Sequence, residues 1–141
     1  MVSPLSALRG VHPSWPFGKL ATVARAWFAA RKPPEPAMPI QHCVFFTFTA
    51  DAPATERAAI LDGLAALTDS LPGLGGFRTG PNRDFEAKSQ AYAHGFLFQA
   101  ESADALAHYA DHPTHKALGA RLCDAVVGGA DGIIVFDLET P

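Results

Sequence analysis

The chain has 141 residues, 48% of them hydrophobic and 18% charged, which is typical of one soluble globular domain. Two cysteines are too few for a disulfide framework, so we expect a reducing, cytoplasmic location. No apolar run reaches the length of a membrane span. Residues 39–141 contain six basic and thirteen acidic residues, a net charge of −7, and are therefore expected to repel nucleic acid.

Residues 1–39 are predicted to be an N-terminal extension, because seven of the twelve prolines lie there. Residues 17–30 could form an amphipathic helix, and the proline-rich run at 33–36 indicates a stiff linker. Three interpretations of the extension remain open: a helix that packs on the domain, a helix on a membrane surface, or translated sequence upstream of a start at Met38. The first and third are favoured, and a membrane partner is not expected.

Residues 40–141 are predicted to form the folded domain, beginning with a strand at 41–49 whose two faces are both largely apolar. A helix begins near Pro53 and ends at Pro72-Gly73. A short strand at 76–79 and a polar loop then lead to a third strand at 91–100. In the first and third strands one face repeats aromatic and histidine side chains: His42, Phe46, Phe48, Tyr92, His94, Phe96 and Phe98.

A proline divides the next helical segment in two. Pro113 has no N–H and disfavours the α conformation at His112, so a helix from Ser102 should end near Ala110 and a second should begin at Pro113. His112 is expected to cap the second helix. His115 falls in the first turn of that helix and begins its apolar face. A turn at 128–132 and a strand at 133–138 complete the chain.

The order βαββαβ predicts an α+β, ferredoxin-like fold: a four-stranded antiparallel sheet with both helical segments on one face. The other face would expose Cys43, Phe45 and Leu97. Because a large apolar patch usually marks an interface, we expect a homodimer in which two sheets pack face to face about a two-fold axis, giving a dimeric α/β barrel.

Several of these residues together resemble the stress-responsive A/B barrel (Dabb) family over roughly residues 40–138. The motifs are His42-x-Val44-x-Phe46-x-Phe48, Pro72-Gly73 with Phe77 and Gly80-x-Asn82, Tyr92-Ala93-His94, and Tyr109-x-x-His112-Pro113-x-His115. The resemblance implies a dimeric α+β barrel. The family includes plant stress-associated proteins, bacterial proteins of unknown role, and a polyketide cyclase that needs neither metal nor organic cofactor.

The resemblance to that cyclase implies that Tyr109 and His115 form its catalytic Tyr–His pair, and that His42 and His94 line the pocket. His115 lies near a helix N-terminus and is expected to be buried; both effects favour a neutral imidazole that can act as a base. Tyr109 could donate a hydrogen bond to an enolate oxygen. No cofactor is expected. No metal is expected either, because Pro113 breaks the register that would align the neighbouring histidines.

Two functions follow. In the first, the domain binds a small hydrophobic carbonyl compound and acts as a cofactor-independent acid/base cyclase or isomerase. Its catalytic residues would be Tyr109 and His115, and its substrate-binding residues His42, His94, Phe46 and Phe96. In the second, the protein is a non-catalytic, stress-associated homodimer whose histidines are structural. A cavity between sheet and helices, faced by the Tyr109 hydroxyl and a His115 nitrogen, would favour the first.

Overall fold

The structure, a computed structural model, describes residues 37–141. The predicted helix at 17–30 and the linker at 33–36 lie outside the described residues. Four strands and three helices follow one another in the predicted order. They are β1 (Ile40–Phe46), α2 (Ala54–Ser70), β2 (Leu74–Pro81), β3 (His94–Ala100), α3 (Ala103–Asp111), α4 (Pro113–Ala125), a 3₁₀ turn η1 (Gly129–Gly132) and β4 (Ile134–Glu139). No helix among the described residues is both long and apolar enough to span a lipid bilayer.

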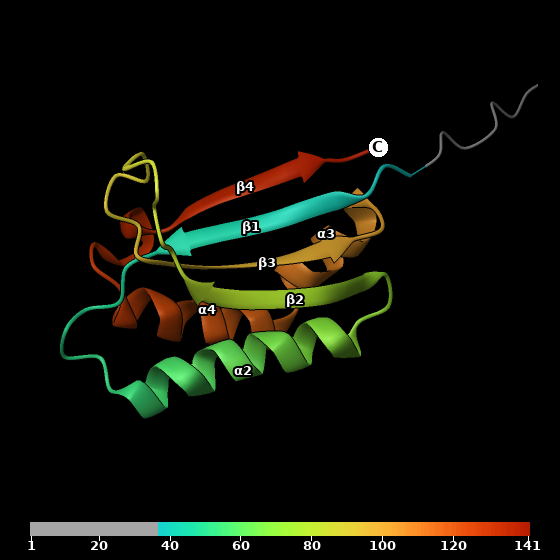
Figure 1. The fold of residues 1–141 in the computed structure, drawn as a ribbon. Coiled ribbons are helices and arrows are strands. Elements are labelled where there is room, and N and C mark those ends of the chain that lie inside the picture. The colour runs from blue at the N-terminus through green and yellow to red at the C-terminus, as the bar shows by residue number, and fades with distance from the viewer. Residues whose placement is uncertain (1–36) are drawn as a thin grey trace, which may run out of the picture. The chain divides into compact units, whose positions relative to one another are not determined.

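The strands form one antiparallel sheet in the order β2-β3-β1-β4, and α2, α3 and α4 lie on one side of it (Figure 1). The predicted ferredoxin-like arrangement is therefore present. Successive side chains of β1 point to opposite faces of the sheet, and those of Val44 and Phe46 point toward the helices, where they are 4% and 0% exposed. Their neighbours Cys43 and Phe45 point to the opposite face, which no described element covers.

Three strand boundaries differ from the prediction. β1 ends at Phe46, and Phe48 makes only an isolated bridge to Val126. β2 is longer than predicted and has an irregular register between Gly75 and Arg78. β3 begins at His94 instead of residue 91, because the preceding loop turns through backbone conformations with positive φ that cannot continue a strand.

The division of the last helical segment is as predicted. Ser102 caps α3 by accepting a hydrogen bond from the Ala105 N–H at 3.2 Å. His112 is extended, with φ −64° and ψ 132°, and its Nδ1 accepts from the Thr114 N–H at 3.2 Å, so it caps α4. Pro113 occupies the first position of α4.

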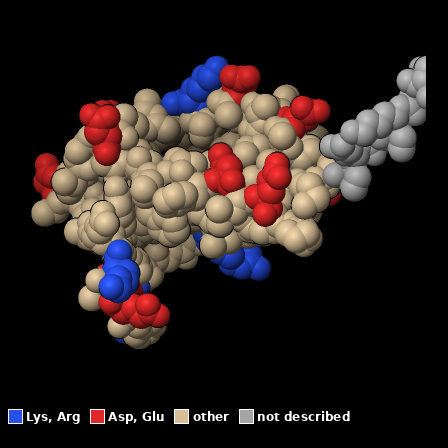
Figure 2. All heavy atoms as spheres, turned by 90° about the horizontal axis from the view of Figure 1, so that it is seen from above, with Lys and Arg blue, Asp and Glu red and all other residues tan. Residues whose placement is uncertain are grey.

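Charged side chains are sparse on the face seen from above. Figure 2 shows scattered acidic and basic groups on a mostly uncharged surface, without a continuous basic area among the residues drawn in colour.

Candidate functional site

Tyr109 lies in the last turn of α3 and points into the core. It is 1% exposed, and its ring packs edge-on against Phe98 with the ring centroids 4.8 Å apart. Burial raises the pKa of the Tyr109 phenol above its ordinary value, so the group stays a neutral donor. Its hydroxyl has no hydrogen-bond partner. An unpaired buried hydroxyl costs about 1–3 kcal/mol, so this group is available to a ligand acceptor.

His115 lies in the first turn of α4, and its ring centroid is 4.4 Å from that of Tyr109. Its Nδ1 is 3.1 Å from the Ala110 carbonyl oxygen. Because a carbonyl only accepts hydrogen bonds, Nδ1 carries the proton and Nε2 of the neutral ring is left as an acceptor. Burial lowers the pKa of His115, although the bond to Ala110 opposes this, so the ring is neutral near pH 7.

His42 joins this pair from β1. Its ring centroid is 5.9 Å from that of Tyr109 and 4.8 Å from that of Phe98. Its Nδ1 is 2.6 Å from Oδ1 of Asp137, the residue directly opposite on β4. The carboxylate orients the imidazole and leaves Nε2 turned away from it. Tyr109, His115, His42 and Asp137 together are called the Tyr–His cluster below.

Asp137 was not among the predicted site residues. Its position depends on the pairing of β1 with β4, two strands 95 residues apart in the chain at this pair. In the sequence, Asp137 stands out only as a carboxylate among the apolar residues of β4. That pattern does not indicate which residue the carboxylate faces.

His94 lies apart from the cluster. It begins β3, opposite Phe46, whereas His42 is opposite Phe98 four residues further along that strand. Its ring packs at 5.3 Å from Phe48, and its Nδ1 is buried without a hydrogen-bond partner. Of the four predicted histidine and tyrosine residues, Tyr109, His115 and His42 therefore lie together, and His94 lies apart from them.

Phe46 and Phe96 occupy the space between His42 and His94. Their ring centroids are 6.3 Å apart, and the two residues are 0% and 5% exposed. Of the cavities described in residues 37–141, none is lined by Tyr109 or His115. The rings packed around that of Tyr109 belong to Phe98, His42 and His115, with centroids 4.8, 5.9 and 4.4 Å away. The described residues also contain no group of three His, Cys, Asp or Glu side chains placed to bind a metal ion.

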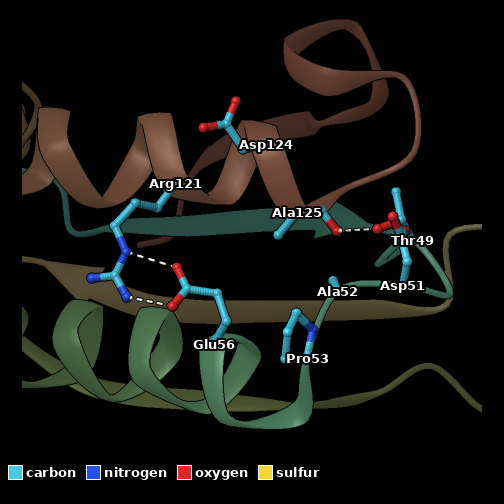
Figure 3. A pocket seen from close by; sticks show the side chains of 8 residues that line it. All are labelled: Thr49, Asp51, Ala52, Pro53, Glu56, Arg121, Asp124 and Ala125. Atoms are coloured by element: carbon cyan, nitrogen blue, oxygen red, sulfur yellow. Dashed lines mark hydrogen bonds and ion pairs between the residues drawn. The ribbon is translucent and has the colours of Figure 1, made fainter.

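Another hollow, of about 250 Å³, lies where α2 begins and α4 ends (Figure 3). Two contacts join polar groups of its lining: Arg121 donates two hydrogen bonds of 2.8 Å to the Glu56 carboxylate, and Thr49 bonds to the Ala125 carbonyl. These contacts hold the two helices together. Asp124, which also lines the hollow, is exposed and takes part in neither contact.

The substitution Tyr109→Phe should raise the free energy of unfolding by about 1 kcal/mol, because it removes a buried hydroxyl that has no partner. Urea unfolding of the ligand-free protein measures the change. The matched control is Tyr92→Phe, because Tyr92 is a half-buried residue in a loop. This substitution should change the free energy of unfolding by less than about 0.5 kcal/mol. A clear loss of stability in Tyr109→Phe would show that the hydroxyl is already satisfied.

Stability should fall as the pH drops below the ordinary histidine value of 6.5, because the pKa of His115 is lowered in the folded state. Above that pH both states are neutral at His115; below it only the unfolded state takes up the proton, until the pH passes the folded pKa. Between about pH 8 and about pH 5, the free energy of unfolding should therefore fall less in His115→Gln than in the wild type. Urea unfolding at both pH values measures it, with exposed His108→Gln as control.

Comparison with known proteins identifies the family of the domain. A family model described as Stress responsive A/B Barrel Domain matches residues 40–140. The stress-response A/B barrel domain-containing protein HS1 of Arabidopsis thaliana is 25% identical over 101 residues, covering 72% of this chain and 89% of that protein.

Two solved structures show the same fold. One, from Jannaschia sp. CCS1 and described as a dimeric ferredoxin-like protein of unknown function, is 41% identical, with a TM-score of 0.68; the match covers 72% of this chain and 99% of that one. The other is a hydroxynitrile lyase from Passiflora edulis, 14% identical, with a TM-score of 0.62 and coverage of 76% and 96%. The chain belongs to the stress-responsive A/B barrel domain (Dabb) family.

Proposed function

We propose that the domain binds a small hydrophobic carbonyl compound at the Tyr–His cluster and catalyses its cyclisation or isomerisation without a cofactor. The observation that carries the proposal is the Tyr109 hydroxyl, which is 1% exposed and has no hydrogen-bond partner. A ligand carbonyl oxygen would supply the missing acceptor. The surrounding phenylalanines suit an apolar ligand, and the neutral state of both Tyr109 and His115 suits an uncharged one.

The chemistry divides between the two side chains. His115 Nε2 removes a proton from the carbon next to the carbonyl, and Tyr109 donates a hydrogen bond to the enolate oxygen that forms. The enolate carbon then attacks a second carbonyl of the same molecule, whose oxygen takes the proton back from the His115 imidazolium, or the imidazolium returns the proton at another position of the enolate. The first outcome is a ring closure and the second an isomerisation, and in both His115 returns to its neutral state.

A ligand must pass neighbouring side chains to reach Tyr109, because that residue is 1% exposed. The rim of the cluster is formed by His42 and Asp137, whose side chains are 12% and 47% exposed. In the proposal, movement of this pair at the edge strand β4 opens the route. The fold itself accommodates catalysis, since a hydroxynitrile lyase shares it at 14% identity, but that likeness carries no substrate to this chain.

The hydrogen bonds that His115 and His42 already make favour a second candidate, a non-catalytic homodimer with structural histidines. In that case the bonds from His115 to Ala110 and from His42 to Asp137 serve only to hold the two rings in place. The two candidates differ in whether the cluster exchanges protons with a bound carbonyl compound.

Exchange of α-hydrogens tests the proposal without knowledge of the natural substrate. A panel of alkyl β-diketones and aromatic ketones in deuterated water should exchange faster with the protein present, measured by proton NMR. His115→Ala should reduce the enhancement by about 100-fold, and Tyr109→Phe should abolish the thermal shift on binding. His108→Ala, an exposed histidine on α3, is the matched control and should behave as wild type.

Exchange at the rate of buffer alone, or equal thermal shifts for wild type, Tyr109→Phe and His115→Ala, would contradict ligand chemistry at this cluster. That result would support the homodimer with structural histidines.

We also propose that the uncovered sheet face binds a second copy of the chain. This face presents Leu97, Phe136 and Leu138, which are 39%, 48% and 53% exposed, beside Phe45, whose ring lies 6.5 Å from that of Phe136. Such an apolar surface is unfavourable in water unless it is covered. The Jannaschia relative, which aligns over 99% of its length, is described as dimeric.

Adjacent residues of β4 give a matched test of this interface. Phe136 and Val135 are 48% and 47% exposed but point to opposite faces, since Phe136 is opposite Cys43 and Val135 is opposite Val44. Phe136→Glu should raise the dimer dissociation constant by about 100-fold or more, because a carboxylate would be buried. Val135→Glu should leave it unchanged. Sedimentation equilibrium measures both, and equal effects would place the interface elsewhere.

A further inference from the structure

The loop at residues 82–93, between β2 and β3, has a defined structure, and we call it the 82–93 arch. Asp84 organises its centre: one carboxylate oxygen accepts from the backbone N–H groups of Lys88 at 2.8 Å and Ser89 at 3.2 Å. The Ser89 side chain, followed by these backbone bonds, lowers the pKa of Asp84. Asn82 joins the two ends of the arch through a 2.7 Å bond to the Tyr92 carbonyl.

Thr47, just beyond β1, ties the arch to the sheet. Its hydroxyl donates to the Ala91 carbonyl at 2.6 Å and accepts from the Ala93 N–H at 3.0 Å. The arch rises beyond the sheet at the end of the strands where β1 finishes (Figure 1) and forms a projection that carries both acidic and basic groups (Figure 2).

The arch holds strained backbone. Four of its residues other than glycine have positive φ: Asp84 at 40°, Ala87 at 53°, Gln90 at 50° and Ala91 at 74°. The two alanines have no side-chain polar group that could compensate locally. Non-glycine residues in this region persist only where the surroundings impose them, and they concentrate at functional segments.

A cavity of about 430 Å³ lies between the arch and the uncovered sheet face. Its floor is apolar and comes from Phe45 on β1 and from Ile134 and Phe136 on β4. Its other lining residues belong to the arch: Asn82, Lys88, Ser89, Gln90 and Tyr92. The floor is therefore continuous with the surface that we assign to the dimer.

We infer that the 82–93 arch is a preformed clamp for the second copy, and that chain from the partner subunit fills the cavity beneath it. The inference rests on the proposed homodimer and adds a contact element that a flat sheet-to-sheet packing would not need. A second copy that covers Phe45 and Phe136 necessarily meets the cavity that these residues line. Phe85, on the arch, is 91% exposed and gives the clamp an aromatic anchor of the kind that dominates interfaces.

Site-specific photo-cross-linking tests the clamp directly. Tyr92→p-benzoylphenylalanine places the photoreactive group in the cavity, and Leu97→p-benzoylphenylalanine places it on the uncovered sheet face. The same substitution at His108, on the helix side, is the negative control. After irradiation of the full-length protein, both Tyr92 and Leu97 variants should give covalent dimers, identified by mass spectrometry, and the His108 variant should not.

The outcomes separate the clamp from the dimer itself. Cross-linking at Leu97 without cross-linking at Tyr92 would keep the dimer and overturn the clamp. Absence of cross-linking at both positions would overturn both. If 8-anilinonaphthalene-1-sulfonate binds the intact dimer at one molecule per chain, and Lys88→Ala abolishes that binding, the cavity takes a small apolar anion instead, and the clamp is again overturned.

Phe85→Ala gives a second, independent measurement. Loss of the aromatic anchor should raise the dimer dissociation constant about tenfold in sedimentation equilibrium. An exposed side chain contributes little to folding of the single chain, so circular dichroism should be unchanged. A dissociation constant equal to that of wild type would contradict a role for the arch in the contact.

Discussion

The arrangement of the site depends on the break between α3 and α4. In one continuous helix, residues six positions apart are rotated by about 120° from each other and lie about 9 Å apart along the axis, so Tyr109 and His115 would face different surroundings. Pro113 removes an N–H and holds His112 extended, with ψ 132°, and the chain changes direction there. The last turn of α3 then meets the first turn of α4, and the two rings lie 4.4 Å apart.

Burial gives this pair its chemical character. It raises the pKa of the Tyr109 phenol and lowers that of the His115 imidazole, so each change favours the uncharged form. The two groups therefore meet as a neutral donor and a neutral base, not as an ion pair. An arrangement of this kind interacts best with a polar but uncharged group, and the carbonyl is the simplest one that offers both an acceptor oxygen and an acidic neighbouring carbon.

The features that follow from local chemistry could be predicted from sequence. The proline break, the His112 cap and the order of elements all depend on residues close together in the chain, whereas the pairing of Tyr109 with His115 was implied by the family resemblance. The Asp137–His42 contact and the separation of His94 depend on strand register, which spans almost the whole domain. The late start of β3 depends on non-glycine residues in left-handed conformations, which sequence patterns do not reveal.

Strand alternation connects the two faces of the sheet. On β1, His42 points to the helix side and Cys43 to the open side; on β4 their opposite residues are Asp137 and Phe136. The edge strand that orients His42 thus carries, one residue away, the aromatic side chain assigned to the dimer. A shift of one residue in the β1–β4 register would separate His42 from Asp137 and turn Phe136 away from the open face. The apolar open face and the His42–Asp137 contact therefore both depend on the same strand register. A second copy packed on Phe136 would restrain β4 and with it Asp137, so dimer contact and imidazole orientation are physically coupled through this strand.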